Sequence, residues 1–173
     1  PVRFETDVVH RAYDAAAAHD FWRILTAVAP VFEAARASFV GKASPVHFFW
    51  GSFDLAFTRF SGRRAPPRPS DDAITREAYS HEQISQGFWP GGPGFDDAAF
   101  YAYAYPEPAG FRAAPILPRA AFYSDALHEL ILPYEAMRTS SSPLETLRTF
   151  LDTSYAAGAD LLHWDRHELE RSL

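Results

Sequence analysis

Residues 99–105 have the sequence AFYAYAY, in which tyrosine alternates with alanine or phenylalanine. Successive side chains of a β-strand point to opposite faces of its sheet, so a period of two predicts a strand. Tyr101, Tyr103 and Tyr105 then share one face, and Phe100, Ala102 and Ala104 share the other. The segment therefore predicts a strand with every tyrosine on the same side of its sheet.

A different period opens the chain. Between residues 14 and 39, apolar side chains recur at alternating steps of three and four, which predicts an amphipathic helix. They are Phe21, Leu25, Val28, Phe32, Ala35 and Phe39. Asp14 is a candidate N-cap and Gly41 a candidate stop. Pro30 lacks an amide hydrogen, so it should kink or split this helix.

The C-terminal end is also helical. Residues 142–145, Ser-Pro-Leu-Glu, match a capping box with proline at the favoured first helical position. The buried stripe is Leu144, Leu147, Leu151, Tyr155 and Leu162. Asp165 and Glu168 have the same spacing as the two residues of a capping box, which predicts a short final helix.

Strand patterns lie between the two helices. Residues 45–60 are rich in aromatic and branched side chains and predict two strands or one bent strand. Residues 79–89 predict another, and residues 121–132 a hairpin turned at Ser124 and Asp125, whereas residues 61–72 have the composition of a solvent loop. This order predicts an α+β domain, with a mostly antiparallel sheet and both long helices packed on one face.

Length and charge limit the functional classes. A chain of 173 residues fits one domain. Its net charge is −6, and no basic block exceeds two arginines, so neither nucleic acid nor an anionic membrane is an expected partner.

The absence of cysteine excludes disulfides, thiolate catalysis and cysteine-bearing metal sites. No run reaches the roughly 20 apolar residues of a membrane helix. We therefore expect a soluble, cytoplasmic protein; the sequence identifies no cofactor.

Four segments together resemble the bacterial family known as domain of unknown function 5996. They are GKASPVHFFWGSFDLAFTRFSGR, REAYSHEQISQGFWPGG, FYAYAYPEPAGF and LPYEAMR. The resemblance runs nearly end to end, and the family's function is uncharacterised. It implies that the chain is the C-terminal half of a longer protein and that a complete site is shared with the missing half.

Histidine is the side chain most suited to proton transfer or metal binding near neutral pH. Of seven histidines, His10, His19, His163 and His167 are expected to be structural or solvent-facing. His47, His81 and His128 lie in predicted strands. We expect a catalytic centre in which His47 and His81 meet, with Asp54 or Glu82 orienting one of them. The alternative is buried imidazoles with a single hydrogen bond each.

Several residues near these histidines could bind a ligand. Arg59 could hold a carboxylate or phosphate, and aromatic side chains could stack on a planar ligand or belong to the core. The candidates are Trp50, Trp89, Tyr101 and Tyr103. If residues 45–60 run straight, His47, Phe49, Phe53, Phe57 and Arg59 share one face. A turn or bulge at Gly51 and Ser52 would change these partners and decide whether Asp54 joins the site.

The leading hypothesis is a domain that binds or transforms a small anionic or aromatic molecule in a histidine, aromatic and arginine pocket on the sheet. One alternative is an interaction domain whose aromatic surface pairs with the missing half or with a second copy. The other is a metal-dependent hydrolase built from the three strand histidines, although no short histidine spacing prearranges a metal site.

Overall fold

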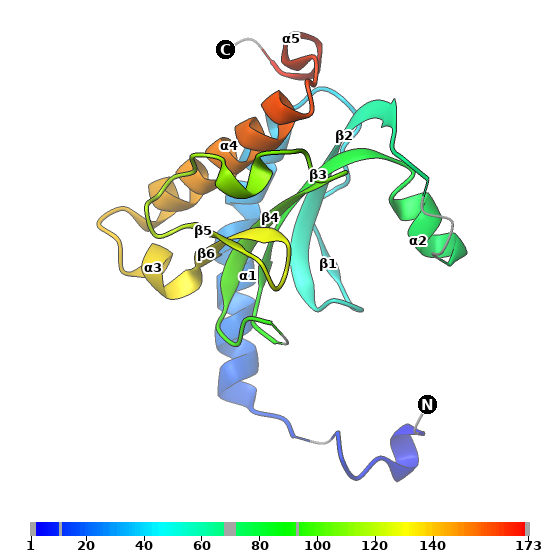
Figure 1. The fold of residues 1–173 in the computed structure, drawn as a ribbon. Coiled ribbons are helices and arrows are strands. Elements are labelled where there is room, and N and C mark those ends of the chain that lie inside the picture. The colour runs from blue at the N-terminus through cyan, green and yellow to red at the C-terminus, as the bar shows by residue number, and fades with distance from the viewer. Residues whose placement is uncertain (1–2, 11, 68–71, 93, 172–173) are drawn as a thin grey trace.

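The structure, a computed structural model, describes residues 3–10, 12–67, 72–92 and 94–171. The strands are β1 (His47–Phe49), β2 (Asp54–Arg64), β3 (His81–Trp89), β4 (Ala99–Tyr105), β5 (Phe122–Ser124) and β6 (Glu129–Pro133). The α-helices are α1 (Ala15–Ala37), α2 (Ala73–Ala78), α3 (Tyr134–Arg138), α4 (Pro143–Leu161) and α5 (Arg166–Leu169) (Figure 1). Two 3-10 helices, η1 (Phe4–Thr6) and η2 (Phe111–Ala113), complete the list.

One sheet contains these six strands in the order β1-β2-β3-β4-β6-β5. Every pair of neighbours is antiparallel. The long strands β2, β3 and β4 lie side by side, and β6 rather than β5 pairs with β4. The predicted α+β class with an antiparallel sheet is confirmed.

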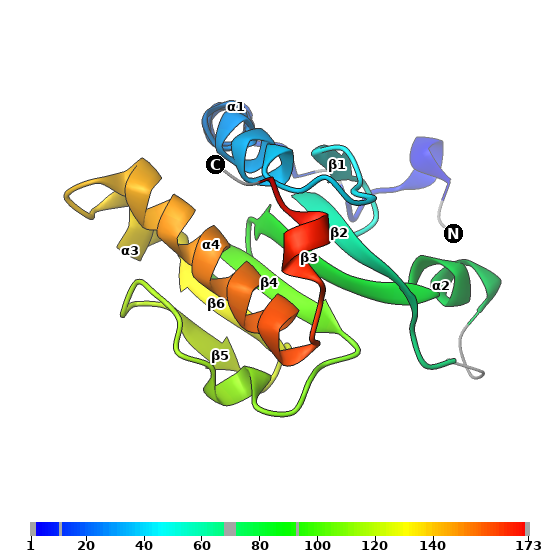
Figure 2. The same cartoon turned by 90° about the horizontal axis from the view of Figure 1, so that it is seen from above.

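Helices α1 and α4 lie across the same face of the sheet, as Figure 2 shows from above. The core fills the space between them and the strands, because alternate strand residues point toward the helices. Its most buried side chains include Phe32, Phe57, Ile84, Phe88, Phe100, Leu147, Phe150 and Leu151. The predicted packing of both long helices on one face is therefore confirmed.

The helix ends follow the sequence signals closely. The Asp14 carboxylate accepts hydrogen bonds from the amides of Ala16 and Ala17, and α1 runs unbroken through Pro30 to Ala37. The expected split at Pro30 is therefore wrong. Helix α4 begins at Pro143 as predicted, but Ser142 makes no side-chain cap bond. Asp165 does cap α5, by accepting from the amide of Glu168.

The segment of residues 45–60 does not run straight. Residues 50–53 form the turn between β1 and β2, and Phe49 pairs directly with Asp54. Strand alternation then places His47, Phe49 and Asp54 on one face and Phe57 and Arg59 on the other. The straight-through grouping of His47 with Arg59 is therefore wrong, because the turn resets the alternation.

Other elements differ from the sequence expectation in extent. Helices α2 and α3 were not predicted, and β2 continues to Arg64 through a bulge. The hairpin of residues 121–132 is present, with β5 ending at Ser124 and β6 beginning at Glu129. Of the predicted loop, residues 68–71 lie outside the described part of the chain. None of the helices described is long and apolar enough to cross a membrane.

Candidate functional site

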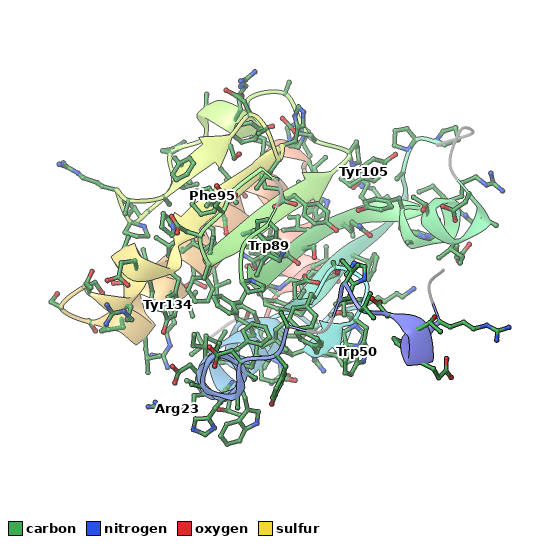
Figure 3. All side chains as sticks on the ribbon, turned by 90° about the horizontal axis from the view of Figure 1, so that it is seen from below. Arg23, Trp50, Trp89, Phe95, Tyr105 and Tyr134 are labelled. Atoms are coloured by element: carbon green, nitrogen blue, oxygen red, sulfur yellow. The ribbon has the colours of Figure 1, made fainter. Side chains whose placement is uncertain are left out.

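The face of the sheet opposite α4 carries a pocket, which we call the sheet-face pocket. Figure 3 looks onto this face, with α4 behind the strands and Trp89 over the middle of the sheet. The pocket has a volume of about 480 Å³. Its lining comes from β2, β3, β4, β6 and the adjoining turns: Ser52, Asp54, Tyr79, Trp89, Tyr101, Tyr103, Leu127 and Glu129.

Strand register explains how these residues meet. In β4, Phe100, Ala102 and Ala104 are buried beneath the helices, so Tyr101 and Tyr103 must point the other way. In β6, Leu130 and Leu132 are buried in the same core, which turns Glu129 to the tyrosine face. The period-two pattern of the sequence therefore builds the aromatic wall of the pocket.

Asp54 is the most buried polar group of the sheet-face pocket, at 5% exposure. Its Oδ1 accepts a hydrogen bond of 2.5 Å from the Ser52 hydroxyl, and its Oδ2 accepts from the Tyr101 hydroxyl. Ser52 comes from the β1–β2 turn and Tyr101 from β4, two strands away from Asp54 in the sheet. Hydroxyl donors from two separate elements therefore fix this carboxylate at one end of the pocket.

Gly87 is what allows Tyr101 to reach Asp54 across β3. Gly87 pairs with Tyr101 in the sheet, and a Cβ at this position would lie 2.5 Å from the Tyr101 hydroxyl oxygen. A contact that short is excluded for real side chains, so any other residue would displace the phenol ring. The glycine thus opens the space that the Tyr101 ring occupies.

The tyrosine wall is packed ring against ring. The rings of Tyr101 and Tyr103 are stacked, with centroids 6.2 Å apart and planes 11° apart. The hydroxyls of Tyr103 and Tyr79 are 3.4 Å apart. Burial raises the pKa of Tyr103, and burial together with the Asp54 charge raises the pKa of Tyr101 well above its usual value. Both phenols therefore stay protonated and can donate hydrogen bonds.

Glu129 lies at the other end of the pocket and differs from Asp54 in its surroundings. Burial, followed by the charge of Asp54, raises the pKa of the Glu129 carboxyl to about 7. No hydrogen bond or cation among the described residues offsets that effect. A carboxyl group that titrates near neutrality can bind a cation or exchange a proton with a ligand, which is the ordinary requirement for an acid or base in a site.

Replacing Tyr101 by phenylalanine tests the hydroxyl-to-Asp54 bond. The variant leaves one oxygen of a buried carboxylate without its donor, so we expect it to lower the free energy of unfolding by about 1–3 kcal/mol. Tyr105→Phe is the matched control on the same strand and face, because the Tyr105 hydroxyl donates an exposed bond of 3.3 Å to the Pro66 carbonyl. Urea denaturation measures both, and equal costs for the two variants would contradict the assignment.

Replacing Glu129 by glutamine should stabilise the protein in a pH-dependent way. The folded protein retains the Glu129 proton up to about pH 7, whereas a carboxyl with the usual pKa of 4.5 loses it earlier. The contribution of Glu129 to stability should therefore become less favourable as pH rises from about 4.5 to 7, and Glu129→Gln should escape that loss. We expect a gain of about 2–3 kcal/mol at pH 8 and little gain at pH 4.

Thermal or urea unfolding across this pH range measures the effect. Glu77→Gln removes a carboxylate from the exposed surface of α2 and controls for net charge. A pH-independent gain, or the same gain in Glu77→Gln, would contradict the assignment of the raised pKa to Glu129.

The two central histidines of the sequence hypothesis are not brought together. His47 pairs with Ala56 and His81 with Arg64, so β2 separates their positions by eight residues, or about 26 Å of strand. His47 is exposed and lines a second hollow beside Asp54 on the sheet-face side. The Nδ1 atom of His81 lies 3.0 Å from the Ser80 hydroxyl. His128 lies in the β5–β6 turn, with its Nδ1 atom 3.4 Å from the Tyr123 hydroxyl.

The hydrogen-bond partners of the Glu82 carboxylate are Ser61, Arg63 and Trp164 rather than His47 or His81. Its Oε2 atom accepts hydrogen bonds from Arg63 Nη2 at 2.7 Å and from the Trp164 indole at 3.1 Å, which tie β2 and β3 to the C-terminal helices. The structure places Glu82 in a tertiary contact outside the sheet-face pocket.

Arg59 and Trp50 also lie outside the pocket. Arg59 faces the helices, where it is 3% exposed and donates to the Ala35 carbonyl and to Gln86. Trp50 projects from the β1–β2 turn and is 84% exposed, well apart from Trp89 (Figure 3). Of the predicted ligand-binding residues, the structure gathers Trp89, Tyr101 and Tyr103.

The pocket contains residues that the sequence hypothesis did not select. They include Glu129, which follows His128 in the chain, and Tyr79, the first residue of the predicted strand 79–89. Strand alternation carries a signal for Glu129. This residue precedes Leu130, which is buried against the helices, so the Glu129 side chain points to the opposite, tyrosine-bearing face of the sheet. In the part of the chain that the structure describes, no three histidine, aspartate or glutamate side chains converge as metal ligands.

Comparison with known proteins adds one finding. Residues 1–171 match the family described as "Family of unknown function (DUF5996)". The resemblance seen in the sequence motifs is therefore confirmed over essentially the whole chain, and the match does not single out a C-terminal half. No curated protein and no solved structure matches the chain.

Proposed function

We propose that this chain, which belongs to the DUF5996 family of unknown function, binds a small molecule in the sheet-face pocket. The proposal rests on the presence, in one aromatic pocket, of two carboxyl groups with different surroundings. Asp54 is held by two hydroxyl donors, while Glu129 has a pKa of about 7 and faces the pocket. Ligand sites combine apolar walls with a few convergent polar groups of this kind.

The destabilising effect of burying the Glu129 carboxyl supports a role in binding. Packing alone would not require a carboxyl group at position 129, since the neutral form of the side chain is the one that burial favours. Proteins commonly retain such destabilising groups where binding or catalysis needs them. Glu129 fits that pattern, because its carboxyl lines the sheet-face pocket beside three aromatic rings of β3 and β4.

The proposal keeps the aromatic part of the sequence hypothesis and drops its anionic part. Trp89, Tyr101 and Tyr103 form the walls of the pocket. Arg59, the residue expected to hold an anion, lies on the other face of the sheet against α1 and α4. The ligand should therefore have an apolar or aromatic body and polar groups that suit carboxyl and phenol partners.

A second candidate function rests on the tip of the β1–β2 hairpin. Phe49, Trp50 and Phe53 are 38%, 84% and 48% exposed. Exposed aromatic side chains that gather at one point commonly mark a contact surface for another protein. This observation favours the interaction-domain alternative, with a second copy of the chain as the simplest partner.

Native mass spectrometry of the protein purified from its own host tests the two candidates together. We expect wild type and Trp50→Ser to retain a small-molecule mass that Tyr103→Leu, which removes a pocket phenol, has lost. Circular dichroism confirms that each variant is folded. A ligand-free mass in every variant, with a dimer that only Trp50→Ser abolishes, would overturn the proposal in favour of the second candidate.

A further inference from the structure

In the part of the chain that the structure describes, the ionisable acidic groups of the sheet-face pocket are not balanced by basic ones. Its lining contains two carboxyl groups, and among the described residues that line it there is no lysine, arginine or histidine. A bound anion would meet Asp54 and Glu129 without a compensating positive group. A bound cation would instead gain attraction from both, and more strongly than in water because the site is partly desolvated.

Glu129 is the carboxyl group available to such a ligand. Both oxygens of Asp54 already accept hydrogen bonds, from Ser52 and from Tyr101. The Glu129 carboxyl has no such partner among the described residues, and burial acts on its charged form without compensation. The bond that Glu129 lacks within the protein is the bond that a positively charged donor would supply.

The walls around Glu129 are suited to the same charge. The β4–β6 pairing ends at Ala102 and Leu130, and extending its register by one residue places Tyr103 opposite Glu129; the Tyr103 ring is stacked on that of Tyr101. The ring of Tyr79 lies 6.5 Å from that of Tyr103. Aromatic faces attract cations within about 6 Å of the ring, and a carboxylate beside several rings is a common means of recognising ammonium groups.

On the premise that the sheet-face pocket binds a small molecule, we propose that its ligand is an organic ammonium ion with an apolar or aromatic body. The ammonium group lies against the Glu129 carboxylate and the Tyr103 ring, and the body lies against Trp89 and Tyr101. The proposal rests on the proposed function and names the class of ligand that it takes.

The protonation of Glu129 links this binding to pH. Because the cation binds the ionised carboxylate, binding should release a proton and strengthen as pH rises from 6 to 8. Among the described residues, the other titratable groups that face Glu129 are Asp54, the three pocket tyrosines and, from the adjoining hollow, Tyr105, Glu107, Tyr123 and His128. The variant His128→Asn separates the titration of His128 from that of Glu129. Asparagine tolerates the positive φ of 58° at this position.

Three probes of matched size test the proposal: 2-phenylethylammonium, 2-phenylethanol and phenylacetate. Each is titrated into the full chain at pH 6 and pH 8 by NMR, with Glu129→Gln and His128→Asn as variants. We expect the ammonium probe to bind at least about tenfold more tightly than the alcohol, and phenylacetate to bind most weakly. Glu129→Gln should remove the ammonium preference and the pH dependence, whereas His128→Asn should retain both.

The outcomes separate this inference from its premise. If the alcohol or phenylacetate shifts the pocket resonances as strongly as the ammonium probe, the inference is overturned and the proposed function stands. An ammonium affinity that Glu129→Gln leaves unchanged also overturns it. If no probe reaches the pocket, the inference fails, and the proposed function is decided separately by the ligand mass in native spectrometry.

Discussion

Replacing Gly87 by alanine is expected to lower the free energy of unfolding by about 2–4 kcal/mol and to abolish the ligand binding that we propose for the sheet-face pocket. The new Cβ would lie 2.5 Å from the Tyr101 hydroxyl oxygen and 2.6 Å from its Cε1 atom. Relief requires the Tyr101 ring to swing away from β3, which breaks its bond to Asp54. One methyl group would therefore disrupt both the sheet and the pocket.

Gly51→Ala is the matched control for that experiment. Gly51 lies in the β1–β2 turn, and a Cβ there would meet nothing within 4 Å. Its stability should stay within about 0.5 kcal/mol of wild type. Urea denaturation gives the stabilities, and the NMR signals of the Tyr101 ring report its position. A Gly87→Ala protein with wild-type stability and an unmoved ring would contradict the account of how β3 admits Tyr101.

Replacing Arg59 by alanine is expected to lower stability by about 3–5 kcal/mol without a direct effect on the sheet-face pocket. The guanidinium is buried between β2 and the helices, 4.2 Å from the centroid of the Tyr155 ring. It donates at 2.7 Å to the Ala35 carbonyl and at 3.1 Å to Gln86. Its removal leaves the Gln86 side-chain oxygen without this donor, takes one of two donors from the Ala35 carbonyl, which also accepts from the Ser38 hydroxyl, and opens a cavity beside Tyr155.

Two comparisons sharpen the Arg59 experiment. Arg59→Met keeps most of the side-chain volume, so it should cost less than alanine and isolate the loss of hydrogen bonds. Arg64→Ala removes an exposed arginine from the end of the same strand and should be nearly neutral. If Arg59→Ala kept wild-type stability but lost ligand binding, Arg59 would belong to the site after all.

Burial also lowers the pKa of Arg59 to about 10, so the guanidinium remains charged at neutral pH. A buried charge with aromatic and carbonyl partners explains why Arg59 looked like an anion anchor in the sequence. An arginine in a strand usually has a specific hydrogen-bond partner. Whether that partner is a ligand or a helix depends on the face of the sheet to which the arginine points. The β1–β2 turn determined that face.

The fold was predictable because its signals are local. The stripe from Phe21 to Phe39, the proline at residue 143 and the tyrosine alternation of β4 each depend on neighbours within one element. Short helices α2 and α3 were missed, since segments of six and five residues carry almost no periodic signal. Pro30 was overweighted, because packing of α1 on the sheet outweighs the lost hydrogen bond.

The candidate site was predictable only in part. Asp54, Trp89, Tyr101 and Tyr103 were all named from sequence, and all four line the sheet-face pocket. Glu129 and Tyr79 were not, because they come from a hairpin and a helix end whose position beside β4 is a matter of strand order. The histidines drew attention by their chemistry, yet β2 separates His47 from His81 along its length.

The most direct test of the central claim is chemical-shift mapping of the full chain by NMR, with a set of small ring-bearing fragments of positive, neutral and negative charge. The account predicts that binding fragments shift the side-chain resonances of Tyr79, Trp89, Tyr101, Tyr103 and Glu129 and leave those of Trp50 unchanged. Shifts confined to Trp50 and Phe53 at the hairpin tip would contradict the assignment of the sheet-face pocket as the binding site.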